Sequence, residues 1–393
     1  MVTDIDNVLS FIDDHEVIQV ARDLIAIPSI THHEGMGMVH YYQKWFKDLG
    51  IPVLLYPCEN KRANFFADYG TVDNSGRYMF NGHMDTKPVD GMTIDPFAGE
   101  IRDGKLYGRG ACDMKGAVAA VLCAFKGLIR AGVKTHSGIT FFSDIEEEYN
   151  ASGFLWARDQ GYYDGLSGLI SCEPSNLEVH IGNRGGFITA FECLGCSVHS
   201  GLAHLGVNAV HGMIEFITEY LKLPYLRVKN PYFGSPTVNF EKIEGGLYLA
   251  AVPDHCIACV DSRLIPETPP ELVQQQVNDL IKRMHCDYGI TIREIKEPAS
   301  WRPRSRKEKA AAIPSDHELT RKLARAVSYA TGKDAVIGGF PAGTIAQAAI
   351  EINVPAVICG PGSIAQAHSA DEWVETDQLV QAARIYTAFI ASV

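Results

Sequence analysis

The chain has 393 residues, more than a single hydrophobic core usually supports, so we expect two domains. A hydrophobic fraction of 46% without long polar tracts predicts a folded globular protein. The formal net charge of -12 argues against nucleic acid or an anionic membrane as a partner, because both attract clustered Lys and Arg.

The N-terminal residues do not resemble a secretory signal. Residues 1–10 carry Asp4 and Asp6 and lack a basic segment followed by an apolar core. The longest clean apolar run, Ala117 to Phe125, is too short to cross a bilayer. We therefore expect a cytoplasmic protein without a membrane partner.

Strand-like and helical segments alternate over the first 183 residues, which is typical of a sheet covered by helices. The segments are Tyr78 to Phe80, Gly116 to Leu128, Ile139 to Ser143, Ser152 to Asp159 and Leu169 to Ser171. The alternation resumes after residue 295, with Ala356 to Cys359 strand-like and Asp377 to Ala391 helical.

Between these parts the pattern changes to paired strands with two helices. Strands are expected at Phe187 to Cys193, Thr237 to Ile243 and Cys256 to Leu264, and helices at Asn208 to Leu221 and from Glu271. This pattern predicts a small α+β domain over residues 184–296, inserted into a larger domain made of residues 1–183 and 297–393.

His83 follows the strand-like run Tyr78 to Phe80, and Asp85 stands two residues further on. Because α/β sheets place ligand sites at strand ends, His83 is a candidate metal ligand with Asp85 as its carboxylate partner. The alternative is a loop His–Asp pair that forms only a hydrogen bond.

Asp113 lies in a glycine-rich loop, Gly108 to Gly116, just before a helical run. Small residues let the backbone approach a bound ion, and the carboxylate would project towards it. The alternative is an aspartate that caps the following helix.

The triplet Glu146-Glu147-Glu148 follows the strand Ile139 to Ser143. Three adjacent carboxylates at a strand end repel one another unless a cation or a proton relieves them. In isolation, the simpler interpretation of the triplet would be a solvated surface run. The position of the triplet after a strand instead favours a functional site.

Glu173 and His368 also follow expected strands. In one sheet, these strand ends and that of His83 can converge. Two histidines with three carboxylates suit divalent ions such as zinc, and a carboxylate that bridges two ions is the usual two-metal arrangement. The sequence therefore indicates a site for two divalent ions, zinc in the first place, with cobalt or manganese as alternatives.

Taken together, these segments resemble the M20 metallopeptidase family. The matching segments, in family order, are Gly82 to Thr86, Asp95 to Phe97, Gly104 to Gly110, Asp113 to Gly116, Glu147-Glu148, Glu173-Pro174, His199 to Gly201 and His368. The resemblance implies an α/β fold, with a mixed-sheet, zinc-exopeptidase-like catalytic domain and an inserted α+β, ferredoxin-like dimerisation domain.

The resemblance also implies roles for individual residues. Asp113 would bridge the two ions, and Asp85 would orient His83. Glu147 would be the general base, preferred to Glu146 because Gly153 lies five residues beyond Glu148. The implied ligands are His83 and Glu173 for one ion, and Glu148 and His368 for the other.

Two residues of the inserted domain complete the implied site. His199 would stabilise the oxyanion in the active site of a partner subunit, which makes the protein a homodimer; the alternative is a surface His at a helix start. Arg263 would bind the substrate carboxylate through its planar fork, and the alternative is an ion pair with Asp261 or Glu267.

The implied reaction is cleavage of the amide bond of an N-acyl amino acid by a hydroxide that bridges the two ions. The alternative is a metallo-exopeptidase that acts on dipeptides or other short peptides. Ile345 follows Gly343-Thr344 where many relatives carry an aspartate, so we expect the substrate pocket to lack one polar group.

Overall fold

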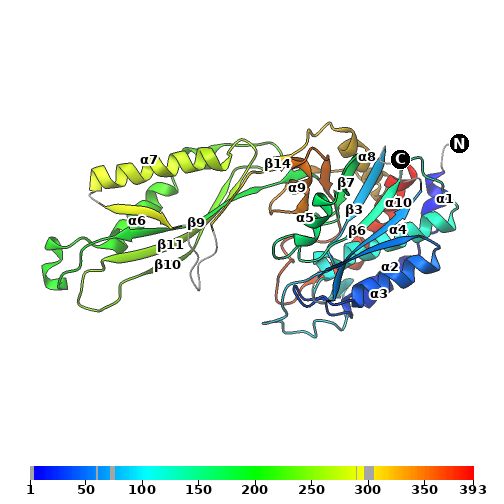
Figure 1. Ribbon diagram of the computed structural model, residues 1–393, viewed down its shortest axis with the longest axis horizontal. Helices are drawn as coiled ribbons and strands as arrows, with labels where there is room; N and C mark the ends of the chain where they lie inside the picture. Colours follow the sequence, from blue (N-terminus) through cyan, green and yellow to red (C-terminus); the bar gives the residue numbers. More distant parts are fainter. Residues whose placement is uncertain (1–3, 59–60, 71–75, 289, 296–304) are drawn as a thin grey trace. The chain divides into compact units, whose positions relative to one another are not determined.

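The computed structural model describes residues 4–393 apart from 59–60, 71–75, 289 and 296–304. The chain forms two compact units (Figure 1). The first unit contains Met1–Gly182, Ala312–Gly338 and Thr344–Val393, and the second contains Asn183–Ala311 and Gly339–Gly343. Each unit is described separately below.

The first unit is built on a mixed sheet with the strand order β1-β2-β6-β3-β7-β16-β8-β14, and β15 also pairs with β8. The strands are β1 (Val53–Cys58), β2 (Arg62–Tyr69), β3 (Arg77–Asn81), β6 (Ile139–Ser143), β7 (Leu166–Ser171), β8 (Val179–Asn183), β14 (Ala311–Ala312), β15 (Ile337–Phe340) and β16 (Ala356–Ile358). β4 (Ile101–Arg102), β5 (Lys105–Tyr107) and β17 (Trp373–Glu375) form a separate antiparallel sheet.

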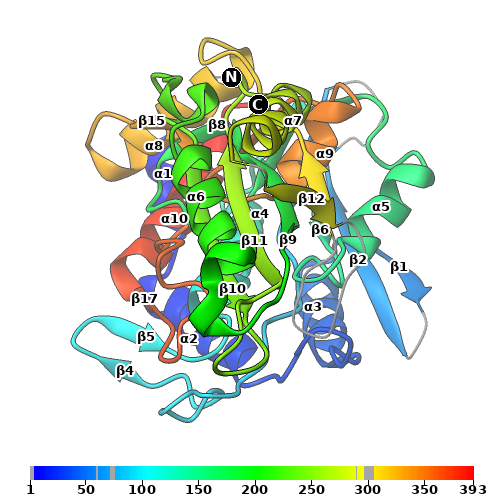
Figure 2. The ribbon, with the colours of Figure 1, turned by 90° about the vertical axis from the view of Figure 1, so that its left-hand side faces the viewer.

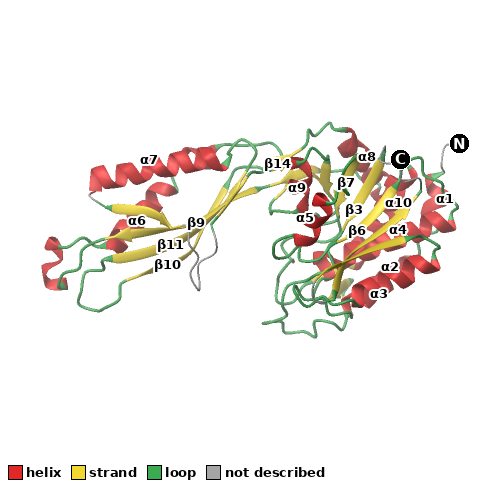
Figure 3. Cartoon of the chain, in the orientation of Figure 1, coloured by secondary structure: helices red, strands yellow, loops and turns green. Residues whose placement is uncertain are grey.

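Helices cover both faces of this mixed sheet (Figure 3). They are α1 (Ile5–Leu9), α2 (Asp14–Ile25), α3 (Gly37–Asp48), α4 (Gly116–Arg130), α5 (Ser152–Asp159), α8 (Glu318–Thr331), α9 (Ile345–Glu351) and α10 (Thr376–Ala391). Successive side chains of a strand point to opposite faces, so adjacent aromatics of β6 identify the two layers. Phe141 contacts Tyr42 of α3, whereas Phe142 contacts Tyr163, which stacks on Phe154 of α5.

The second unit has a ferredoxin-like topology. Along the chain it runs β9 (Gly185–Leu194), α6 (Ala209–Tyr220), β10 (Thr237–Gly245), β11 (His255–Leu264), α7 (Pro270–Tyr288) and β12 (Thr291–Ile295), and the sheet order is β10-β11-β9-β12. Both helices pack on the same face of this antiparallel sheet (Figures 1 and 2). Phe191 of β9, Phe216 of α6 and Val277 of α7 share the core between them.

The fold class expected from the sequence is thus confirmed, but the second unit contains more of the chain than the expected inserted domain, including Gly339–Gly343. The second unit extends to Ala311 rather than to residue 296, because β13 (Arg306–Glu308) pairs with β9. Within the part of the chain that the structure describes, no helix is long and apolar enough to cross a membrane.

Candidate metal centre

Four neighbouring strands of the first unit end at one edge of the mixed sheet. β6, β3, β7 and β16 are adjacent and mutually parallel. His83 lies two residues after β3, Glu148 five after β6, and Glu173 two after β7, while His368 follows β16. Because these strands are parallel neighbours, their ends lie at one edge of the sheet, as expected from the sequence.

His83, Asp113 and Glu173 form the first group of possible ligands. All three are buried, and each offers a ligand atom within 4.8 Å of the others. His83 Nε2 lies 3.0 Å from Asp113 Oδ1 and 4.0 Å from Glu173 Oε1. His83 Nδ1 lies 2.9 Å from the backbone oxygen of Asp85, which directs Nε2 towards the group.

Asp113, Glu148 and His368 form the second group, within the same 4.8 Å limit. His368 Nε2 lies 3.3 Å from Asp113 Oδ2 and 3.0 Å from Glu148 Oε2. Asp113 is common to both groups and faces His83 with one oxygen and His368 with the other. This is the arrangement that a carboxylate bridging two ions requires.

Asp113 is not a helix cap. Lys115 occupies the N-cap position of α4, and Asp113 has non-helical backbone angles. The alternative interpretation of Asp113 as a helix cap is therefore wrong. Its two carboxylate oxygens face the imidazoles of His83 and His368 instead.

The electrostatics of the cluster favour a bound cation. Burial and the charges of Asp113 and Glu147 raise the pKa of Glu173 well above its usual range. Burial also raises the pKa of Glu147 to about 8, and the carboxylates of Glu148 and Asp113 add to the effect. Carboxylates that repel one another next to two imidazoles match the donor set of zinc-type divalent ions, so the residues fit the expected ions.

The structure distinguishes Glu146 from its neighbours in the triplet. Its carboxylate accepts hydrogen bonds from Arg62 and Ser152 and lies 3.0 Å from Nδ1 of His32. Although burial raises it, these contacts lower the pKa of Glu146 to about 2. Glu146 is thus fixed in an ion pair and belongs to neither ligand group, whereas the charges of His83, Glu148 and Asp113 act on Glu147.

Asp85 contacts the triplet as well as His83. Its carboxylate accepts from the backbone N–H groups of Glu147, at 3.1 Å, and Glu148, at 3.2 Å, and from the hydroxyl of Thr31, at 2.9 Å. The distance from Asp85 Oδ1 to His83 Nδ1 is 3.6 Å. The close contacts of the carboxylate therefore hold the loop of Glu147 and Glu148, and the backbone oxygen holds His83.

The remaining expected residues belong to other parts of the fold. His199, in the second unit, is exposed, and its Nδ1 accepts from the N–H of Gly201 at the start of a 3₁₀ helix. Arg263 of the same unit forms an ion pair with Asp261 at 2.8 Å. Ile345 is buried as the first residue of α9, which Thr344 caps.

Two contacts next to the cluster were not anticipated from the sequence. The ammonium of Lys87 lies 3.0 Å from Glu148 Oε2 and donates to the backbone oxygen of the same residue. The buried carboxylate of Glu372 accepts from the backbone of the Asp113 loop. The position of Lys87, two residues after Asp85 in the same extended segment, was the available signal for the first contact.

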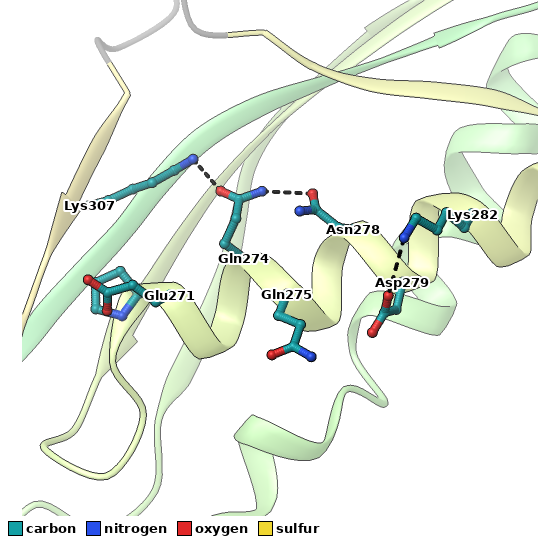
Figure 4. Close-up of a pocket in the computed structure, with 8 residues that line it drawn as sticks. Glu271, Gln274, Gln275, Asn278, Asp279, Lys282 and Lys307 are labelled. Carbon is teal, nitrogen blue, oxygen red and sulfur yellow. Dashed lines mark hydrogen bonds and ion pairs between the residues drawn. The ribbon is translucent and has the colours of Figure 1, made fainter.

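The second unit carries a polar groove along α7 (Figure 4). Its polar side chains pair with one another: Gln274 contacts both Lys307 and Asn278, and Lys282 lies near Asp279. Such mutual pairing is typical of a solvated helix surface, so we assign the chemistry to the cluster of the first unit.

Comparison with known proteins agrees with this geometry. Residues 79–392 match the peptidase family M20/M25/M40. The chain is 25% identical to a probable succinyl-diaminopimelate desuccinylase of Staphylococcus epidermidis, over 96% of this chain and 98% of the relative. It is 29% identical to an acetylornithine deacetylase of Edwardsiella ictaluri, over 95% and 96% of the two chains. The crystal structure of an aminopeptidase from Bacillus cereus has the same fold, with a TM-score of 0.78 at 20% identity over 97% and 99% of the chains.

Proposed function

The chain belongs to peptidase family M20/M25/M40, and on this basis we propose that it hydrolyses the amide bond of an N-acyl amino acid with two divalent ions. The observation that carries the proposal is the position of Asp113 between two His-carboxylate groups, with Glu147 beside them. The full-length similarity to a desuccinylase and a deacetylase favours an acyl group as the part removed.

We assign His83 and Glu173 to one ion, Glu148 and His368 to the other, and Asp113 to both. Bound there, zinc or another divalent ion such as cobalt or manganese would polarise the scissile carbonyl and lower the pKa of the attacking water molecule. Metal binding would also lower the pKa of Glu147, because a nearby cation favours the ionised carboxylate.

Glu147 is the proposed general base. Its carboxylate would take a proton from the attacking water and deliver it to the leaving amine nitrogen. Glu146 is unsuited to this role, because Arg62 and Ser152 already bind its carboxylate. Asp85 would fix the backbone of Glu147 and Glu148 during both proton transfers.

The second unit would supply two further groups. We propose that Arg263 binds the carboxylate of the substrate, exchanging its ion pair with Asp261 for that contact. We also propose a homodimer in which His199 of one subunit stabilises the oxyanion in the other. Exposed apolar side chains near His199 support an interface. Leu205 is 65% exposed and Leu249 is 99% exposed. Leu249 lies close to His199, because the backbone of His199 pairs with that of Ala251 in an isolated β-bridge.

A substrate panel tests the proposed reaction. N-acetyl, N-succinyl and N-carbamoyl amino acids should be assayed beside dipeptides, each with zinc, cobalt or manganese. Turnover of acylated amino acids is the expected result, and turnover of dipeptides alone would establish the exopeptidase alternative. Failure of every substrate with every metal would contradict the assignment as a hydrolase. A cytoplasmic location stays a prediction from the sequence.

A further inference from the structure

Glu372 is a buried carboxylate in the segment that also carries His368. Only 1% of the residue is exposed, and four donors surround its two oxygens. Oε1 accepts from the backbone N–H groups of Cys112, at 2.8 Å, and Asp113, at 2.9 Å. Oε2 accepts from the N–H of Gly110, at 3.0 Å, and from Nη1 of Arg109, at 2.9 Å.

Three of these donors are backbone groups of the loop that presents Asp113. A carboxylate that accepts several backbone N–H bonds fixes the path of a loop more firmly than neutral acceptors do, because charge-assisted hydrogen bonds are shorter and stronger. The N–H of Asp113 itself is one of the donors, so the contact acts on the residue shared by both ligand groups.

The segment of Glu372 is also tied to the strand that precedes the Asp113 loop. β17, which begins at Trp373, pairs with β5 (Figure 2), and the backbone oxygen of Glu372 accepts from Gly108 at 3.0 Å. On the other side of His368, the thiol of Cys112 donates to the backbone oxygen of Ser363 at 3.2 Å. The segment that carries His368 is therefore attached to the Asp113 loop on both sides of that histidine.

We propose that Glu372 is a positioning residue of the metal centre, whose carboxylate sets the distance between Asp113 and His368. The inference rests on the proposed metal centre and adds a residue that does not itself contact an ion. Removal of outer residues that orient metal ligands weakens metal affinity roughly 10–100-fold, and we expect a loss of that size here.

The substitution Glu372→Gln tests this role with little change in volume. An amide has one acceptor oxygen, so either the pair Cys112 and Asp113 or the pair Gly110 and Arg109 would face an NH₂ group. Asp371→Asn is the matched control: it neutralises the neighbouring carboxylate, which accepts from the backbone N–H and the hydroxyl of Thr93 instead.

Metal-free wild-type and variant proteins should be titrated with Co²⁺, with bound cobalt measured by dialysis and its coordination by visible absorption. We expect Glu372→Gln to bind cobalt roughly 10–100-fold more weakly with an altered spectrum. We expect Asp371→Asn to match the wild type. Circular dichroism of the metal-free proteins would establish that the variants are folded.

If Glu372→Gln does not fold, Glu372→Asp can be used instead. It keeps the carboxylate but shortens the side chain by one methylene, so the loss of cobalt affinity should be smaller than that expected for Glu372→Gln. Wild-type affinity and spectrum in whichever variant folds would overturn the proposal. A wild-type chain that bound no cobalt would instead overturn the metal centre on which it rests.

Discussion

Asp113 is the residue that the two candidate ligand groups of the proposed metal centre share. Its two oxygens lie 3.0 Å from His83 and 3.3 Å from His368. The hydrogen bonds with these imidazoles keep the pKa of Asp113 below its usual range despite burial, so the side chain is ionised and available to cations.

Replacing Asp113 with Ala should therefore remove metal from both positions rather than from one. Each group would retain only two of its three ligands, one of them an imidazole. Elemental analysis should find less than one ion per chain in Asp113→Ala, whereas Glu173→Ala should retain the ion held by Glu148 and His368. Two ions in Asp113→Ala would show that this residue bridges nothing.

The affinity for metal should rise with pH. In the metal-free chain, hydrogen bonds with Asp113 and Glu148 raise the pKa of His368 from 6.5 to about 9. Because protonated imidazole cannot ligate a cation, binding should tighten from pH 6.5 towards about 9 and should release protons. Calorimetry in buffers of different ionisation enthalpy would count them, and an affinity without pH dependence would contradict this expectation.

The same shift has the opposite consequence for the metal-free fold. The folded-state pKa of His368 exceeds the unfolded value, so its protonated form contributes stability at low pH. That contribution is lost as the pH rises through about 9.

At the scale of elements, the strand ends were the most predictable part of the site. His83, Glu173 and the glutamate triplet each follow an apolar run, and β3, β6 and β7 are neighbours in one parallel portion of the sheet. The periodicity of the sequence was therefore sufficient to indicate convergence at one edge.

The contacts between loops could not be predicted in this way. Glu372 and Gly110 are separated by 262 positions, and their hydrogen bond depends on the course of two irregular segments. The separation of Glu146 from Glu147 depends on a local backbone turn, since Glu146 has φ of 58°. Neither feature has a periodic pattern, so from the sequence Glu147 could be preferred to Glu146 as the general base only through a family resemblance.

The loop of Asp113 depends on the conformation of Gly110. This residue has φ of 82°, and an added Cβ would lie 2.8 Å from Thr86 Cγ2. Gly110→Ala should destabilise the metal-free protein by about 1–3 kcal/mol and weaken metal binding. Gly104→Ala is the control, because φ there is 73° but an added Cβ meets nothing within 4 Å.

Urea denaturation and cobalt titration of both variants would test this comparison. Gly104→Ala should lose some stability and keep its metal affinity. Equal metal affinity in Gly110→Ala and Gly104→Ala would show that the conformation of the Asp113 loop does not govern the site.

For the whole molecule, the strand and helix pattern was sufficient to predict a small inserted α+β domain, whereas its ferredoxin-like topology came from the family resemblance and its end was not predicted correctly. The short strand β13 is highly charged, Arg306-Lys307-Glu308, and its pairing with β9 gives no apolar signal. The apolar pattern therefore places the domain boundary at residue 296, although β13 and the residues up to Ala311 still belong to the second unit.

The proposed exchange of His199 between subunits can be tested by mixing variants. His199→Ala and Glu147→Ala chains should each be inactive alone. Co-expressed, they should recover about one quarter of wild-type activity, since half of randomly paired dimers are mixed and one of their two sites is intact. Absence of recovery in a preparation shown to contain mixed dimers would rule out a role of His199 in the partner's site.

The most direct test of the account is a joint measurement of bound metal and turnover for Glu147→Gln. The carboxamide cannot accept the proton of the attacking water, and general bases contribute roughly 10²–10⁴-fold to such reactions. We expect the variant to hold two ions per chain, as the wild type does, and to lose nearly all turnover of acylated amino acids. Wild-type turnover by Glu147→Gln would show that Glu147 is not the general base of the reaction.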